Sequence, residues 1–361
     1  MRFYDALQLD PSILKRKIRE SEQPRERHKL MTAIAVRSLL IVLFAIMMIS
    51  PVAPVFGPEN SPMAVALFCI LLGIRFVDFG YCIKDSMINL AVVFTLLLLA
   101  PSAAANVNLV FSAIIHVAAF FTILFMTSDR PEMGNAGIYT FAYIYLSGNP
   151  VTGQLLWNRA LLTLVGYILC GTILFVKHRK KNPSVRFWSL VTGFSVSNKK
   201  TQWHAQLALG VGLILALGSF LQLPRMMWAA FACGSVLGCY AATAAEAKTR
   251  VVQRIVGVVL GSAVFFLLYQ ICPVALRSML GPLGGFCLGF YTDYRFKTAS
   301  NCIGAIYMVE GSYGLNTSVF LRVGHNLLGV SFGFLFLVVY QKIVSKCLSD
   351  RTEDSMESPT A

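Results

Sequence analysis

Long apolar runs separated by short polar segments make up most of the chain. Twelve runs can be marked, near residues 31–50, 61–77, 86–101, 106–127, 134–148, 156–176, 204–221, 226–244, 252–271, 274–290, 297–312 and 320–341. A helix needs about 20 predominantly apolar residues to cross about 30 Å of hydrocarbon, with a range that tolerates tilt. The pattern therefore predicts an all-α polytopic membrane protein with about twelve transmembrane helices. A removable signal peptide is not expected, since a polar segment of thirty residues precedes the first run.

Composition and charge agree with this interpretation and add an orientation. The chain is 56% hydrophobic and 13% charged, with a net charge of +14 and a mean hydropathy of +0.66. So positive a chain could bind nucleic acid, but the Lys and Arg residues lie in short loops between apolar runs, which is typical of topology control. If the N-terminus is cytoplasmic, 26 of the 31 basic residues fall on the cytoplasmic side and four at the opposite ends, with Arg37 near the inner end of the first run. We therefore expect both termini in the cytoplasm and no nucleic-acid partner.

A basic stretch divides the runs six and six, and short motifs repeat across it. "FMTSDR" at 125–130 matches "FYTDYR" at 290–295, and "RALLTLVG" at 159–166 matches "RVGHNLLG" at 322–329, at nearly equal offsets. Six spans per unit is an even number, so the two repeats should have the same orientation. The predicted organisation is a cytoplasmic segment 1–30, a first six-helix repeat 31–177, a basic cytoplasmic linker 178–203, a second repeat 204–346 and a cytoplasmic tail 347–361.

The fifth and eleventh runs are the shortest, and both contain or adjoin glycine. Short glycine-interrupted segments at matched positions indicate a transporter site, because a broken helix frees backbone groups for a substrate. Ordinary tilted helices are the alternative. Tyr139 and Tyr143 lie on one side of the fifth run, where they either stack an aromatic substrate or belong to the core and the interfacial belt.

Arginines at the ends of the runs are the first candidates for binding. Charge inside a bilayer is costly, yet Arg159 and Arg322 open the sixth and twelfth runs, each seven residues before a glycine. They either extend to the headgroups or line a shared pathway, where a guanidinium would pair with both oxygens of a carboxylate.

Two further arginines open the ninth run. Arg250 and Arg254 lie one helical turn apart, and Gly257 and Gly261 follow at the same spacing. One interpretation is a cytoplasmic vestibule that collects anions. The other is a positive-inside anchor on a helix whose glycines allow close packing.

An acid and an imidazole near the outer ends form a candidate proton relay. Glu310 falls inside the eleventh run, and His325 lies three residues after Arg322. Since histidine titrates near physiological pH, the two could couple transport to protons, or Glu310 could simply neutralise Arg322. His116, in the middle of the fourth run, is interpreted as a hydrogen-bonded packing residue.

Motifs of enzymes and metal sites are missing from the sequence. It has no Walker loop, no G-x-S-x-G elbow, no H-E-x-x-H and no G-x-G-x-x-G after a strand. The nine cysteines are scattered without a C-x-x-C pair, which favours packing over metal or disulfide chemistry. We expect no enzyme activity, no cofactor and no metal, and transport driven by ATP would need a separate chain.

The stretch "LPRMMWAAFACGSVLGCYAATAAEAKTRVVQRIVGVVLGSAVFF" resembles the signature region of the fusaric acid resistance family, also called aromatic acid exporters. In that family a Pro and a Trp open one span, and two arginines followed by Gly-Thr and a further glycine open the next. Pro224 and Trp228 match the first part, Arg250 and Arg254 with their two glycines match the second, and Val258 replaces the threonine. The resemblance is clearest over residues 203–345.

This resemblance implies a multi-pass protein of the bacterial inner membrane. Such a protein would export aromatic or other hydrophobic carboxylates, driven by the proton gradient, and would form a homodimer. It also adds Trp228 to the candidate translocation residues. Two alternatives stay open: an anion channel for organic acids that uses the same arginines, and a lipid-handling or assembly protein whose basic face meets anionic headgroups.

Overall fold

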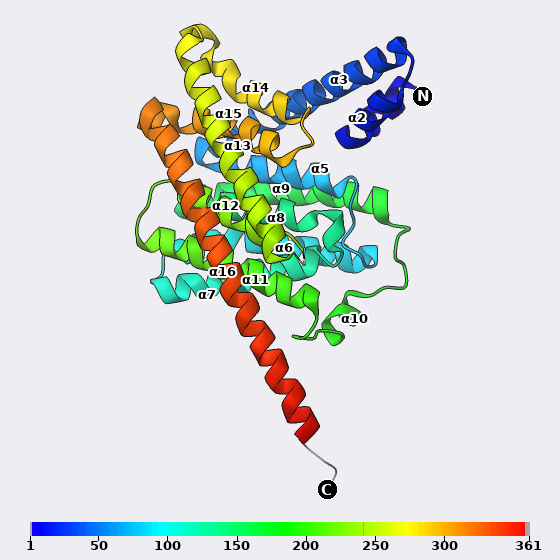
Figure 1. Ribbon diagram of the computed structural model, residues 1–361, viewed down its shortest axis with the longest axis vertical. Coiled ribbons are helices and arrows are strands. Elements are labelled where there is room, and N and C mark those ends of the chain that lie inside the picture. Colours follow the sequence, from blue (N-terminus) through cyan, green and yellow to red (C-terminus); the bar gives the residue numbers. More distant parts are fainter. Residues whose placement is uncertain (1, 241, 358–361) are drawn as a thin grey trace. The chain divides into compact units, whose positions relative to one another are not determined.

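The architecture is entirely helical within the described residues, which are 2–240 and 242–357 in a computed structural model, with side chains to residue 346. Helix accounts for 82% of the structure, and Figure 1 shows how the helices are arranged. The longer helices are α2 (Pro11–Glu20), α3 (Pro24–Ile49), α5 (Ser61–Ile74), α6 (Ile83–Ala105), α7 (Leu109–Thr127), α8 (Asn135–Ser147), α9 (Gly153–His178), α11 (Lys199–Phe220), α12 (Met227–Leu237), α13 (Ala244–Ile271), α14 (Leu280–Leu288), α15 (Tyr294–Tyr313) and α16 (Leu315–Glu357). Shorter turns are α1 (Phe3–Gln8), α4 (Val52–Phe56), α10 (Phe187–Thr192), η1 (Pro58–Asn60), η2 (Pro131–Met133) and η3 (Val274–Met279).

A helix lies at each of the twelve predicted apolar runs. Among the described residues, seven helices are long and apolar enough to cross a membrane, and the segments 58–74, 227–237 and 274–288 are shorter apolar helices. The prediction of an all-helical polytopic membrane protein is confirmed at this level. Because α8 with 13 residues is only about 20 Å long, twelve complete crossings stay a prediction, as do the locations of the termini.

The fifth and eleventh runs form helices without a break. α8 continues through Gly137, and α15 continues through Gly304 and Gly311 to Tyr313. The interpretation of these segments as interrupted helices is therefore wrong for the described backbone, because the helix continues through each of these glycines. α15 ends where Gly314 adopts φ +75°, a conformation that glycine reaches without steric cost, and α16 begins at the next residue.

The chain divides into two compact units by its internal contacts. The first unit comprises Met1–Met48 and Val252–Leu327, and the second comprises Ile49–Val251 and Leu328–Ala361. In the second unit α7 packs on α11 and α6, and α5 packs on α8 and α9; α5, α9, α11 and α7 run across the view one below another (Figure 1). The units are defined by contacts and not by sequence similarity, so the predicted duplication stays a prediction.

The first unit has two small apolar cores. One joins α1 and α2 to α3 through Ala6, Leu14 and Leu30, with Phe290 packed against them. The other lies among α13, α14, α15 and α16 and is formed by buried residues that include Phe265 and Cys302. The N-terminal amphipathic helix α2 thus uses its apolar face for its own chain and presents its basic face outward.

The two arginines of the predicted repeat each accept a hydrogen bond at the carbonyl oxygen. Thr163 donates its hydroxyl to the carbonyl oxygen of Arg159 at 2.7 Å, and Asn326 donates its side-chain amide to the carbonyl oxygen of Arg322, also at 2.7 Å. Each donor lies four residues after its arginine, as the "RALLTLVG" and "RVGHNLLG" match requires. The carbonyl oxygens of the two arginines thus accept the same kind of bond from the residue four positions later.

The glycines of the same two motifs also make matching contacts. Gly166 packs against Leu67 of α5, and Gly329 packs against the backbone of Ala229 of α12. In each half the sixth predicted helix therefore approaches the second, at sequence offsets that differ by one residue. Two independent packing contacts at corresponding positions are what an internal repeat would produce.

Candidate functional site

The site begins with Arg254, which lies half-buried on α13 and belongs to the first unit. Its Nε donates to Oδ1 of Asn326 at 3.1 Å, and its Nη1 donates to the hydroxyl of Tyr294 at 2.9 Å. These partners are an amide and a phenol, so they orient the guanidinium without neutralising it. No carboxylate in the described part of the chain forms an ion pair with Arg254.

A second arginine lies close along the same chain of contacts. Arg322 on α16 is only 3% exposed, its Nε donates to the sulfur of Cys302 at 3.5 Å, and its carbonyl oxygen accepts the Asn326 amide described above. We name Arg254, Tyr294, Asn326, Arg322 and Cys302 the arginine cluster. A buried guanidinium carries a large desolvation cost unless its donors are used, and Arg322 uses its Nε in this way.

Close packing of two helices holds the cluster together. A Cβ on Gly257 of α13 would lie 2.5 Å from the carbonyl oxygen of Arg295 and 2.8 Å from Cβ of Thr298, and one on Gly261 would lie 2.6 Å from Cα of Ala299. The predicted small-residue packing is therefore confirmed, with α15 as the partner helix. The close approach brings Tyr294, at the start of α15, within reach of Arg254.

A second polar group lies at the other end of α13. Tyr269 donates its hydroxyl to Glu310 in a short hydrogen bond, and the guanidinium of Arg277 lies 4.1 Å from the centre of the Tyr269 ring. Fifteen residues separate Arg254 from Tyr269, which corresponds to about 22 Å of helix. The apolar core around Phe265 occupies the intervening length, so the two polar groups are distinct layers.

The structure does not join the predicted relay pair by a hydrogen bond. Glu310 accepts from Tyr269, whereas Nδ1 of His325 lies 2.8 Å from the carbonyl oxygen of Leu321, one turn earlier on its own helix. The phenol is therefore a partner of the acid that sequence reasoning did not identify. The coupling role of Glu310 and His325 stays a prediction.

Arg159 lies on α9 in the second unit and is completely buried. Its Nε donates to Oδ1 of Asn60 at 2.8 Å, its Nη1 to the carbonyl oxygen of Asn149 at 2.9 Å, and its Nη2 to the carbonyl oxygen of Glu59 at 2.7 Å. The interpretation in which Arg159 extends to lipid headgroups is wrong, because the protein itself supplies these oxygens. The guanidinium fastens the loops before α5 and α9 to each other.

Arg250 and Trp228 belong to the second unit, whereas the arginine cluster belongs to the first. Arg250 is half-buried one turn before Arg254 on α13, and Trp228 is 3% exposed near the start of α12. Their place in the signature region is clear, but their translocation role stays a prediction.

The two tyrosines of α8 are core residues. Tyr143 is fully buried, stacks on Phe120 with 5.1 Å between ring centres, and its hydroxyl lies 2.9 Å from Nδ1 of His116. Tyr139 is 1% exposed and meets Phe79 edge to face at 6.1 Å. Of the two interpretations, packing in the core is the one that these contacts favour. The prediction that His116 is a hydrogen-bonded packing residue is confirmed.

Three members of the cluster were not identified from the sequence. Asn326 could have been found, since an amide inside an apolar run one turn after Arg322 needs a polar partner. Tyr294 lies within the repeated "FYTDYR" motif, which was used only to detect the duplication. Cys302 carries no local signal, because a buried cysteine is ordinarily a packing residue.

Comparison with known proteins finds one family model that matches the part of the chain containing the cluster. Residues 211–336 match the family model described as fusaric acid resistance protein-like, a range that includes all five residues of the cluster and Glu310. No curated protein and no solved structure matches the chain. The match supports a membrane protein of the transporter type. The resemblance to fusaric acid resistance proteins is therefore confirmed over residues 211–336 of this multi-pass membrane protein.

Proposed function

We propose that the protein is a secondary transporter of organic carboxylates and that Arg254 is the group that binds the carboxylate. The proposal is based on the hydrogen-bond partners of this guanidinium, which are all neutral. Its charge is held in place by the neutral side chains of Asn326 and Tyr294, within the part of the chain that resembles fusaric acid resistance proteins. A cation oriented by neutral donors and acceptors attracts an anion more strongly than one already paired with an acid.

The geometry of the side chain favours a carboxylate. Nε and one N–H of Nη1 are used by Asn326 and Tyr294, and Nη2 donates to no described residue. Nη1 therefore retains one N–H and Nη2 retains both, and a guanidinium can pair with both oxygens of a carboxylate through two such groups. Arg322, one turn before Asn326 on α16, adds a second positive charge to the same field.

Proton-coupled export of aromatic or other hydrophobic carboxylates from the bacterial cytoplasm is the form of transport that the resemblance favours. In this proposal Arg254 and Arg250 collect the anion near the cytoplasmic end of α13. Glu310 is the group that exchanges the proton, with Tyr269 as its partner. His325 is assigned to the same coupling step.

Flux into proteoliposomes tests the proposal. Purified full-length protein is reconstituted with an imposed pH gradient, and uptake of radiolabelled benzoate and hydroxybenzoates is measured. Arg254→Gln should raise KM by about 10- to 100-fold, since a hydrogen bond to a charged group contributes about 1.5–3 kcal/mol. Arg254→Lys keeps the charge without the fork and should be intermediate.

Arg295→Gln is the matched control. Arg295 is an exposed arginine of the same unit, and it pairs locally with Asp293 at 2.9 Å. Its flux should equal that of the unaltered protein. Equal loss of flux in Arg254→Gln and Arg295→Gln would mean that general positive charge, and not the oriented guanidinium, is responsible.

The same preparation distinguishes the proposed transporter from two other functions. Currents far above carrier turnover in planar bilayers, unaffected by Glu310→Gln, would indicate an anion channel. Tightly copurified lipid without flux of any organic anion would indicate a lipid-handling protein. Glu310→Gln should abolish the dependence of flux on the pH gradient while leaving carboxylate exchange intact if the transporter is coupled to protons.

A further inference from the structure

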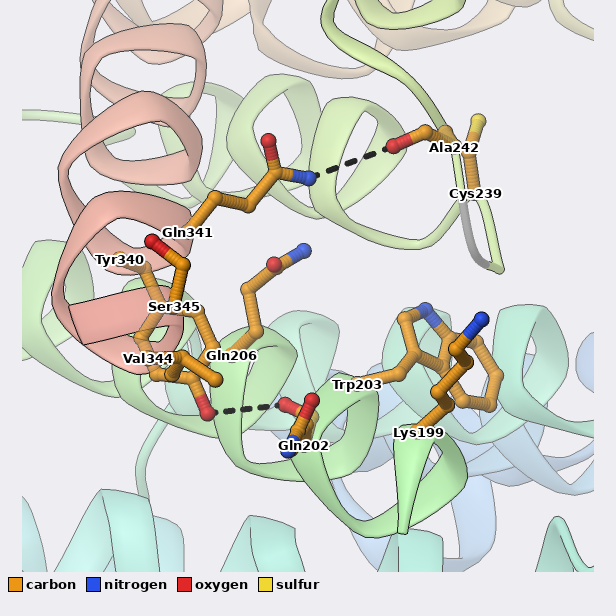
Figure 2. Close-up of a pocket in the computed structure, with 10 residues that line it drawn as sticks. All are labelled: Lys199, Gln202, Trp203, Gln206, Cys239, Ala242, Tyr340, Gln341, Val344 and Ser345. Atoms are coloured by element: carbon orange, nitrogen blue, oxygen red, sulfur yellow. Dashed lines mark hydrogen bonds between the residues drawn. The ribbon is translucent and has the colours of Figure 1, made fainter. Parts of the chain in front are cut away.

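A pocket of about 330 Å³ lies in the second unit, and no residue of the arginine cluster lines it. It is bounded by the first two turns of α11, by the segment after α12 and by α16 near residues 340–345 (Figure 2). The predicted topology places this end of the helices at the cytoplasmic face. The volume falls at the lower end of the range for sites that bind small molecules.

Gln206 is the residue that makes this pocket more than a surface hollow. Its side chain is only 7% exposed, it projects into the pocket (Figure 2), and it makes no hydrogen bond with any described residue. An amide has two donors and an acceptor, and those of Gln206 are not among the fully enclosed polar atoms of the described residues. They are therefore accessible from the pocket and can bond there to water or to a ligand.

The surrounding walls are already held by hydrogen bonds. Tyr340 donates its hydroxyl to the carbonyl oxygen of Gln202 at 3.0 Å, Gln341 donates its amide to the carbonyl oxygen of Ala242 at 3.3 Å, and the indole N–H of Trp203 donates to the carbonyl oxygen of Leu237 at 3.1 Å. These bonds tie α16 to α11 and to the segment after α12. The pocket is therefore formed before any ligand binds.

The charge of the lining has one sign. Among the described residues that line the pocket, Lys199 is the one ionisable cation and none is Asp or Glu. Seven residues separate Lys199 from Gln206 on α11, which corresponds to about 10.5 Å along the helix. The pocket thus offers a positive charge near its rim and an unpaired amide deeper inside, with the Trp203 side chain on the wall between them.

We propose that this pocket binds a small organic anion that carries a second hydrogen-bonding group. The anionic group pairs with Lys199, the apolar body lies along Trp203, and the second polar group pairs with Gln206. As the place where solute is collected before transport, the site rests on the proposed function. As a binding site, it stands on the lining residues alone.

Equilibrium binding to the full-length protein in lipid nanodiscs tests the proposal. The protein carries Arg254→Gln, which removes the proposed carboxylate-binding group of the arginine cluster, so that any binding measured does not depend on Arg254. The probes are 4-hydroxybenzoate, benzoate, which lacks the second polar group, and 4-hydroxybenzamide, which lacks the charge. 4-Hydroxybenzoate should bind about three- to tenfold more tightly than benzoate, as one net hydrogen bond predicts. Gln206→Leu should abolish this preference, and Lys199→Gln should weaken both acids equally while leaving 4-hydroxybenzamide unchanged.

Two further variants guard against indirect effects. Ser345→Phe fills the pocket from an exposed position and should abolish binding without disturbing the wall hydrogen bonds. Gln154→Leu, an exposed glutamine outside the pocket, should bind all three probes as the parent does. Absence of saturable binding, an unchanged preference in Gln206→Leu, or normal binding in Ser345→Phe would each overturn the proposal.

The binding result and the flux result are separable. If the pocket variants bind normally while flux still depends on Arg254, the pocket proposal fails and the transporter proposal stands. If the pocket variants alter binding but the unaltered protein transports none of the acids, the site stands and the transporter proposal fails.

Discussion

Replacing Gly261 with alanine tests whether the contact between α13 and α15 organises the first unit. The added Cβ would lie 2.6 Å from Cα and 2.8 Å from the carbonyl carbon of Ala299. Ordinary contacts begin near 3.4 Å, and the obstructing atoms are backbone that cannot rotate away. The helices must therefore separate by nearly 1 Å, or α15 must shift along α13. Overpacking of this kind costs about 1–3 kcal/mol.

The same separation would lengthen the hydrogen bond between Arg254 and Tyr294, which is 2.9 Å long across these two helices. Gly261→Ala should therefore lower the melting temperature by several degrees and also raise the KM for carboxylate flux. Gly311→Ala on α15 is the matched control, because nothing lies within 4 Å of its added Cβ. Alanine is a better helix former than glycine by about 1 kcal/mol, so this variant should be neutral or slightly more stable. Equal melting temperatures for the two variants, measured by intrinsic fluorescence in detergent, would refute the packing argument.

Two other predictions follow from hydrogen bonds outside the first-unit core. Asn60→Ala removes the acceptor of Arg159 Nε and the bonds that Asn60 donates to the carbonyl oxygens of Phe56 and Leu155. It leaves a buried charged donor unsatisfied, so we expect a loss of about 2–3 kcal/mol in unfolding free energy. Asn158→Ala, which removes a 3.3 Å bond to the Phe56 carbonyl and a 3.3 Å bond from the exposed Gln154 side chain, should lose less in the same denaturation assay. The pKa of Asp293 is lowered by hydrogen bonds from the side chain and the backbone of Arg295. The stabilisation that the ionised Asp293 gives the folded protein is therefore fully present above the ordinary aspartate pKa near 3.9. It is lost as the pH falls through the lowered pKa. The difference in melting temperature between Asp293→Asn and the unaltered protein should stay constant from pH 7 to pH 5 and shrink only below about pH 4; a change between pH 7 and pH 5 would contradict the assignment.

Hydropathy predicted the positions of the helices, and motif spacing predicted the region that resembles a known family. Each of the twelve apolar runs contains a helix, because the free energy of burying an apolar segment depends on composition over one or two dozen consecutive residues. The signature around Arg250 and Arg254 was sufficient to identify the family region. The pairing of the two glycines with a neighbouring helix was also readable, since small residues at a four-residue spacing have a simple steric meaning.

Helix continuity was less predictable. The glycines of the fifth and eleventh runs suggested breaks, yet α8 and α15 are continuous. A glycine within a helix weakens the helix by about 1 kcal/mol, which neighbouring contacts can offset. Whether it interrupts the helix therefore depends on what packs around it, and that information is not local.

The sequence by itself determined which residues of this protein are apolar enough to form helices and where positive charge accumulates, and it predicted that Arg159 and Arg322 occupy equivalent positions. Only the tertiary structure decided that Arg159 binds carbonyl and amide oxygens of neighbouring loops, while Arg254 faces an amide and a phenol. It alone placed an unpartnered Gln206 in a pocket. The physical reason is that burial follows from the composition of a segment, whereas the partner of a polar group is set by atoms a hundred residues away that folding brings within 3 Å.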